Sequence, residues 1–254
     1  MNTKIFRNPR TNNPLVYRSG TLVDETNGDI FPIIDDIPCF AQGIPRRHRF
    51  WQWVYDRTAF AYDAMARVGW RLGFGGAPIL RDSYLREIEI TPDALVLETA
   101  VGTGENIRML PKHAHYVGLD ISLNMLRQCQ HKLSTLGRTA QLVQGDAQRL
   151  PFAADVFDVV FHMGGLQFLT DPMAAIHEMA RVIKPGGRVL AVDETASLRG
   201  ILQRGKVAVP TSPLSALQHA APTGVQNVRC RLLSQGELFM LAFDKPVHPI
   251  SKTL

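Results

Sequence analysis

The sequence has 254 residues, of which 45% are hydrophobic and 20% charged, so the chain can bury a full-sized core and carry one large domain with an appendage. Its net charge of +5 is spread along the chain, and basicity this mild is typical of a solvated surface. Three cysteines lie far apart, without a C-x-x-C pair or an N-terminal apolar signal segment. We therefore expect a reducing, cytoplasmic setting. No apolar run approaches bilayer length, so no transmembrane helix is expected.

Residues 1–45 are predicted to form a small β-rich cap, because they are rich in Asn, Pro, Asp and Gly and favour short strands separated by turns. Residues 28–40 resemble the last part of the zinc-ribbon-type module that precedes some methyltransferases. Where such a ribbon carries paired cysteines, this chain has LVYRSG at residues 15–20. Without thiolate pairs, we predict no metal site.

Residues 46–90 are predicted to form a helical lid and linker. Aromatic side chains on one helix face usually belong to a core or an interface. However, Tyr55-Asp56 and Tyr62-Asp63 resemble the segment before the core domain of ubiquinone- and menaquinone-pathway methyltransferases, where this helix covers the active site. The resemblance implies that Tyr55 and Tyr62 face the cofactor or the methyl acceptor, with simple packing as the alternative. The glycines at 69–76 favour a hinge.

Residues 94–105, ALVLETAVGTGE, predict a strand, a tight glycine turn and a helix start. Such a turn lets the backbone approach a ligand, because glycine lacks a Cβ and tolerates positive φ, while the helix start offers unpaired N–H groups. A dinucleotide fingerprint needs a third glycine where this chain has Ile107, which disfavours a nicotinamide cofactor. Glu98 would repel a pyrophosphate but would accept hydrogen bonds from an ammonium group.

The same stretch resembles the first motif of the class I S-adenosylmethionine-dependent methyltransferases, in which an acid precedes the glycines. The resemblance implies that Glu98, Ala100, Gly102 and Gly104 bind S-adenosylmethionine. Ala100 stands where the family has its first glycine, and this change would shift the ligand or narrow the turn.

From residue 91 onward, short apolar runs alternate with helical patterns. This alternation predicts a domain at 91–254 with a Rossmann-like, doubly wound α/β sheet. Asp120 ends the second strand beside the glycine turn, where its carboxylate can accept both ribose hydroxyls. The family resemblance implies that Ile121 flanks the adenine. Residues 145–152, GDAQRLPF, match a family phrase in full, which implies that Asp146 accepts from the adenine amino group and that the Ala147 N–H reaches the ring.

Residues 157–162 are predicted as the fourth strand, and the end of that strand lies where ligands bind in such sheets. His162, Met163 and Gln167 are therefore expected to face the transferred methyl group. A lone histidine is more often structural, but His162 is a candidate base or orienting donor and a cofactor contact. The following residues, FHMGGLQF, contain no Asn/Asp-Pro-Pro-aromatic motif, so an exocyclic base amine is disfavoured as the acceptor.

The C-terminal part predicts a helix at 171–184, a strand after the phrase KPGG at 184–187, a short helix near 198–203 and a proline-bearing loop. Two further β-runs, 225–233 and 237–244, resemble the antiparallel closing pair that completes the family's seven-stranded sheet.

The leading hypothesis is an S-adenosylmethionine-dependent methyltransferase that acts on a small, apolar or aromatic metabolite by in-line transfer to oxygen or carbon. Such transfer neutralises a positive charge, so positioning and desolvation contribute most. One alternative is an RNA methyltransferase that holds phosphates with residues 46–49, RRHR. Another is a non-catalytic methyltransferase-like subunit, motivated by Ala100 and the cysteine-free ribbon.

Overall fold

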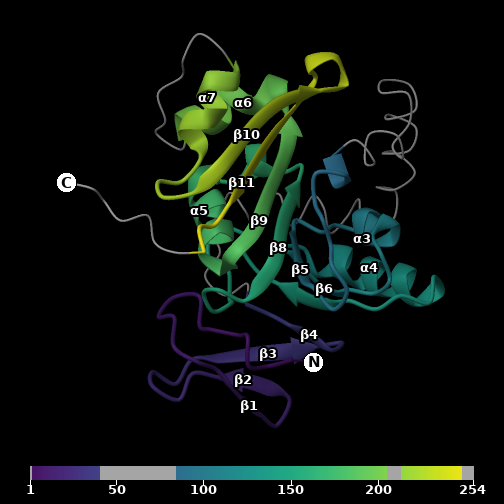
Figure 1. Ribbon diagram of the computed structural model, residues 1–254. Helices are drawn as coiled ribbons and strands as arrows, with labels where there is room; N and C mark the ends of the chain where they lie inside the picture. Colours follow the sequence, from purple (N-terminus) through teal and green to yellow (C-terminus); the bar gives the residue numbers. More distant parts are fainter. Residues whose placement is uncertain (1, 41–83, 205–212, 248–254) are drawn as a thin grey trace.

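The computed structural model describes residues 2–40, 84–204 and 213–247, which form a small antiparallel sheet beside a larger α/β domain (Figure 1). The predicted roles of Tyr55 and Tyr62, the hinge and the basic residues 46–49 lie outside the described residues. The small sheet has the order β1-β2-β3-β4, and its strands are β1 (Val16–Arg18), β2 (Thr21–Val23), β3 (Ile30–Ile34) and β4 (Ile37–Pro38).

The larger sheet has seven strands in the order β10-β11-β9-β8-β5-β6-β7. Their bounds are β5 (Leu95–Thr99), β6 (His115–Asp120), β7 (Gln141–Gln144), β8 (Phe157–Met163), β9 (Ile183–Glu194), β10 (Gln226–Leu233) and β11 (Leu238–Asp244). The strands β7, β6, β5, β8 and β9 are parallel, and β11 pairs antiparallel with both β9 and β10. This arrangement confirms the predicted seven-stranded, mostly parallel sheet with an antiparallel last strand.

Helices cover both faces of this sheet (Figure 1). They are α3 (Glu105–Met109), α4 (Leu123–Thr135), α5 (Pro172–Val182), α6 (Thr195–Arg204) and α7 (Pro213–Ala220), with 3-10 turns η1 (Leu166–Phe168) and η2 (Ser234–Gly236). Successive strand residues point to opposite faces, so Leu97 packs in the cluster with α5 to α7, whereas Val96 packs in the cluster with α3 and α4. None of the helices in the described ranges is long and apolar enough to cross a membrane.

Local signals explain where the helices begin. The Ser122 hydroxyl accepts the Met125 N–H at 3.1 Å and caps α4, and the Asp171 carboxylate accepts the Ala174 N–H at 3.0 Å and caps α5. Two elements differ from the sequence expectation. The phrase KPGG belongs to β9, because α5 already ends at Val182. The predicted proline-bearing loop contains α7, where Pro213 occupies the first turn, a position that tolerates proline.

The small sheet is joined to the large one at the edge of β7. Cys39 forms a parallel bridge with Gln144, and the Phe40 N–H donates to the Gln144 carbonyl at 2.8 Å. Phe6 forms an antiparallel bridge with Phe152, and the rings of Phe6, Phe40 and Phe152 pack together. The N-terminal segment therefore contacts Gln144 and Phe152, which flank the loop with the predicted adenine residues Asp146 and Ala147.

A buried carboxylate organises the loops of the small sheet. Asp24 accepts hydrogen bonds from the side chains of Asn8 at 2.7 Å, Thr11 at 2.9 Å and Asn13 at 3.1 Å. Burial raises the pKa of Asp24, but these hydrogen bonds and one from the Thr26 N–H outweigh it and leave the pKa below its usual value. Hydrogen bonds to an anion thus tie these loops together.

Candidate cofactor and acceptor site

The strand order reverses between β5 and β8, and ligands of open α/β sheets bind beyond the carboxyl ends of the strands at such a point. The glycine turn follows β5 there. Ala100, Gly102 and Gly104 have φ values of 58°, 53° and 80°, all in the left-handed region that favours glycine. Ala100 thus adopts the backbone conformation that a glycine would take. The expected turn is present, and Gly104 is the N-cap of α3.

Asp120 ends β6 beside this turn. Its Oδ2 accepts the Gly102 N–H at 2.8 Å and its Oδ1 accepts the Ser122 N–H at 2.9 Å. Asp120 is 9% exposed and thus buried, at the carboxyl end of β6. Binding of the ribose hydroxyls by Asp120 stays a prediction. Asp120 also holds the glycine turn in place, a role that its sequence position alone did not indicate.

Glu98 lies on the sheet face covered by α3 and is 2% exposed. Its Oε1 accepts the side-chain amide of Asn106 at 2.6 Å. The Asn106 Oδ1 in turn accepts the hydroxyl of Tyr84 at 2.7 Å. The sequence did not point to Tyr84 or Asn106, because both are common residue types and Tyr84 is remote from the glycine motif.

Strand β7 leads into the loop that carries Asp146 and Ala147. Asp146 accepts the backbone N–H of Gln148 at 2.9 Å and its side-chain amide at 2.9 and 3.0 Å. The Gln148 Oε1 accepts the Thr170 hydroxyl at 2.9 Å and thus connects this loop to the start of α5. Ala147 is buried, and Ile121 is partly exposed nearby, with its carbonyl accepting the Gln144 side chain at 3.1 Å. The structure therefore brings the predicted adenine residues to the ends of neighbouring strands.

His162 lies near the end of β8, on the face covered by α5. Its Nδ1 is 2.9 Å from Oγ1 of Thr99, the residue opposite it on β5. Its Nε2 is buried and has no hydrogen-bond partner among the described residues. A Cβ on Gly165 would lie 3.9 Å from both this Nε2 and the Cβ of Ala100, so His162, the glycine turn and the loop after β8 meet here. Burial lowers the pKa of His162 to about 4, which leaves the ring neutral at pH 7.

Asp193, near the end of β9, was not anticipated. Its Oδ2 accepts the Leu166 N–H at 2.8 Å and its Oδ1 accepts the Glu194 N–H at 2.7 Å. Burial raises the pKa of Asp193 to about 6. The carboxylate anchors the loop between Met163 and Gln167, both partly exposed and both predicted to face the acceptor.

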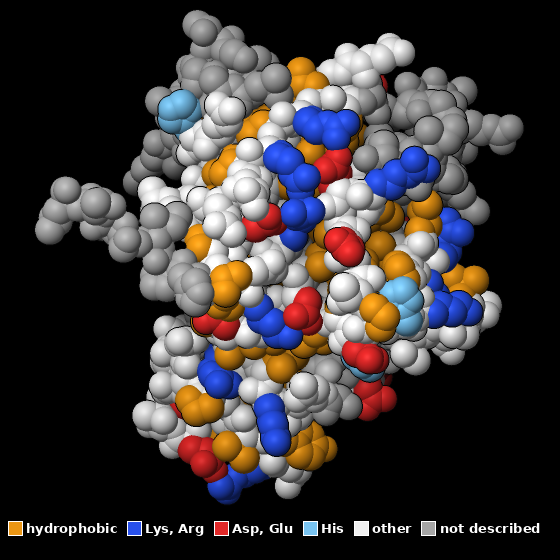
Figure 2. All heavy atoms as spheres, in the orientation of Figure 1, with side chains coloured by type: hydrophobic (Ala, Val, Ile, Leu, Met, Phe, Trp, Pro, Cys, Tyr) orange, Lys and Arg blue, Asp and Glu red, His pale blue; other side chains and the backbone are white. Residues whose placement is uncertain are grey.

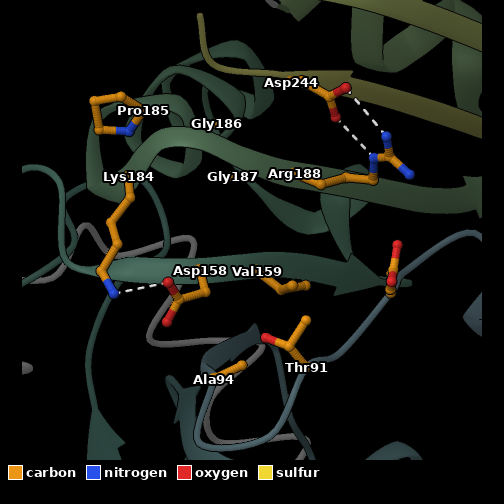
Figure 3. A pocket seen from close by; sticks show the side chains of 11 residues that line it. Thr91, Ala94, Asp158, Val159, Lys184, Pro185, Gly186, Gly187, Arg188 and Asp244 are labelled. Carbon is orange, nitrogen blue, oxygen red and sulfur yellow. Dashed lines mark hydrogen bonds and ion pairs between the residues drawn. The ribbon is translucent and has the colours of Figure 1, made fainter. Parts of the chain in front are cut away.

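A cavity of about 420 Å³ lies at the opposite edge of the sheet, where the parallel strands begin (Figure 3). Lys184 and Asp158 point toward one another across it, with Nζ 2.7 Å from Oδ1. Arg188 and Asp244 form a second pair at 2.7 Å. These charges are therefore paired. None of the predicted site residues lines this cavity, so the cavity is separate from the glycine turn.

The surface over β10 and β11 mixes basic and acidic side chains (Figure 2). Glu87 pairs with both Arg231 and Arg229, and its distance to Arg229 is 3.7 Å. Arg188 pairs with Asp244. The acids Glu87 and Asp244 thus lie among the basic side chains of this face.

Residues 97–191 match the family model described as "Methyltransferase domain". The chain is 33% identical over 143 residues to the ubiquinone/menaquinone biosynthesis C-methyltransferase UbiE of Syntrophotalea carbinolica, covering 55% of this chain and 59% of that protein. It is 37% identical over 142 residues to the demethylmenaquinone methyltransferase of Corynebacterium urealyticum, covering 56% and 57%. The match thus spans less than two thirds of these relatives.

Among solved structures, the chain is similar to the phosphoethanolamine N-methyltransferase 2 of Haemonchus contortus in complex with S-adenosyl-L-methionine. The TM-score is 0.63 at 17% identity, covering 81% of this chain and 61% of that one. At this identity, the likeness shows the fold.

The sheet order and the glycine turn at its switch point define a class I methyltransferase fold. Residues 97–191 thus match a methyltransferase domain, and the chain is similar to methyltransferases of ubiquinone and menaquinone biosynthesis. This similarity agrees with the family and the cofactor that the sequence motifs predicted. The individual site residues remain predictions.

Proposed function

We propose that this protein transfers the methyl group of S-adenosylmethionine to a small aromatic acceptor of the quinone or phenol class. The observation that carries the proposal is the glycine turn fixed by Asp120 at the switch point, within a segment 33–37% identical to quinone-pathway methyltransferases. The names of those relatives favour carbon as the methylated atom, and oxygen is the alternative.

The residues present fit this cofactor. The turn from Ala100 to Gly104 gives a backbone surface with little side-chain bulk, and Asp120 and Glu98 supply carboxylates on neighbouring strands. We assign Asp120 to the ribose hydroxyls and Glu98 to the ammonium group of the methionine moiety. The loop of Asp146 and Ala147, with Ile121, is assigned to the adenine. S-adenosylmethionine itself supplies a methyl group on a positively charged sulfur.

His162 and the loop after β8 are assigned to the acceptor side. A base with a pKa of about 4 removes a proton from a phenol poorly at pH 7. The neutral imidazole can still orient an acceptor through its buried Nε2, next to Ala100 and Gly165. We therefore assign His162 an orienting role, with Met163 and Gln167 beside the acceptor. His162 is buried, and exclusion of water around it favours in-line transfer from a sulfonium.

The test is transfer of a radiolabelled methyl group from S-adenosylmethionine to three kinds of acceptor. These are short-chain demethylmenaquinols, simple phenols, and purified tRNA and rRNA. The proposal predicts label in the small aromatic acceptors, located by mass spectrometry, and its loss in an Asp120→Ala variant. Label in RNA alone would favour the RNA methyltransferase alternative. Cofactor binding without transfer to any acceptor would favour a non-catalytic subunit.

A further inference from the structure

We propose that Tyr84 and Asn106 are positioning residues that aim the Glu98 carboxylate at the ammonium group of the cofactor's methionine moiety. This inference rests on the proposed cofactor site. It adds two residues to that site, one of them before the methyltransferase motif begins.

The chemistry of the three side chains fixes the direction of each hydrogen bond. An ionised carboxylate can only accept, so the Asn106 side chain must present its NH₂ group to Glu98, at 2.6 Å. The Asn106 carbonyl oxygen then faces Tyr84, whose hydroxyl must donate, at 2.7 Å. The donors therefore run in one direction, from Tyr84 through Asn106 to Glu98.

Burial makes this chain of hydrogen bonds important. Tyr84 is 0%, Glu98 2% and Asn106 7% exposed. A buried carboxylate is costly unless hydrogen bonds satisfy it, and hydrogen bonds in a low-dielectric interior strengthen one another. Because Asn106 lies in the first turn of α3 and Tyr84 packs in the apolar cluster beside β5, two separate elements fix the rotamer of Glu98. A carboxylate held in this way can meet an ammonium group without losing rotamer freedom on binding.

The inference predicts a selective loss of affinity, measured by calorimetry with two ligands. S-adenosylhomocysteine carries the amino-acid moiety with its ammonium group, whereas 5′-methylthioadenosine lacks that moiety. The variants are Tyr84→Phe, which removes one hydroxyl oxygen, and Asn106→Leu, which removes the amide at similar volume. The matched control is Tyr116→Phe, because Tyr116 is also a buried residue, 6% exposed, and its hydroxyl donates to the Pro111 carbonyl at 2.6 Å, away from Glu98.

We expect Tyr84→Phe to weaken S-adenosylhomocysteine binding by about tenfold and Asn106→Leu by at least that factor. The affinity of both variants for 5′-methylthioadenosine should stay within about twofold of wild type. Tyr116→Phe should change the affinity for neither ligand. If both ligands weaken equally in Tyr84→Phe, or neither changes, the positioning role is wrong while the cofactor site stands. If the wild-type protein binds neither ligand, the proposed function fails as well. If Asn106→Leu does not fold, Tyr84→Phe, which removes a single oxygen atom, still tests the positioning role.

Discussion

The imidazole of His162 and the hydroxyl of Thr99 are hydrogen-bonded across neighbouring parallel strands, with Nδ1 2.9 Å from Oγ1. Both residues are buried, on the sheet face opposite to Glu98. The two faces of the sheet beside the glycine turn thus carry different groups. The hydrogen-bonded carboxylate of Glu98 lies on the α3 face, and the neutral imidazole of His162 lies on the α5 face. Each arrangement leads to a separate test.

The buried imidazole makes stability depend on pH. The pKa of His162 falls from 6.5 to about 4 on folding, so the unfolded chain binds a proton between these values and the folded chain does not. Stability from the neutral ring is therefore present above pH 6.5 and is lost as pH falls toward 4. We expect this residue to lower the free energy of unfolding by roughly 2 kcal/mol between pH 7 and pH 5. Urea unfolding of wild type and His162→Gln at both pH values measures the difference.

The comparison between variants isolates His162, because Asp193 acts in the opposite direction in both proteins. The pKa of Asp193 is raised to about 6, so its contribution to stability is lost as pH rises from about 3.8 to 6. The control is His131→Gln, at an exposed position of α4, which should follow the wild-type curve. An unchanged pH slope in His162→Gln would show that the ring is not held neutral by burial.

Gly104 is expected to tolerate no side chain. Its φ of 80° is strained for other residues, and an added Cβ would meet the Cys129 Sγ at 2.6 Å. Gly104→Ala should therefore cost more than the roughly 1 kcal/mol of the left-handed strain alone. Gly137→Ala is the matched control, because its φ is 60° with no atom near its Cβ position. Thermal and urea unfolding measure both.

A double-mutant cycle tests the cause. If the clash with Cys129 dominates, Gly104→Ala combined with Cys129→Ala should be more stable than the sum of the single effects predicts. Strict additivity would assign the cost to backbone strain only.

The aromatic contact between the N-terminal segment and Phe152 should stabilise the protein strongly. Phe6 is 0% exposed, and its ring stacks on that of Phe152 with centroids 5.8 Å apart. Truncating a fully buried phenylalanine costs about 3–5 kcal/mol, so we expect Phe6→Ala to lower the urea midpoint markedly. Tyr17→Ala, at a side chain 53% exposed, should have little effect. Equal, small effects would mean that the two sheets do not depend on each other.

Ala100 should not weaken the cofactor site. Its φ of 58° is the conformation that a glycine would adopt at this position, so the turn keeps its path. Ala100→Gly should therefore change the S-adenosylhomocysteine affinity by less than about threefold, equivalent to less than 1 kcal/mol. Calorimetry provides the measurement, and a tenfold gain in affinity would show that the methyl group obstructs the pocket.

The sequence predicted the large sheet well because its signals are local. The strand before Ala100, the acid that ends β6 and the GDAQRLPF phrase each carry a motif that fixes both the element and its place. The supporting contacts could not be predicted in this way. Tyr84, Asn106 and Asp193 act through hydrogen bonds to residues 8 to 27 positions away, and their residue types are common in cores and turns. The helix α7 was missed because proline is compatible both with a loop and with a first helical turn.

The most direct test of the proposed site is calorimetry with S-adenosylhomocysteine on the wild-type protein and two carboxylate variants. Asp120→Asn alters the edge of the sheet that carries the glycine turn, whereas Asp158→Asn alters the cavity at the opposite edge. We predict binding to the wild type, at least tenfold weaker binding to Asp120→Asn because a charge-assisted hydrogen bond is lost, and wild-type affinity in Asp158→Asn. Absence of binding at millimolar ligand, or a loss confined to Asp158→Asn, would contradict the assignment.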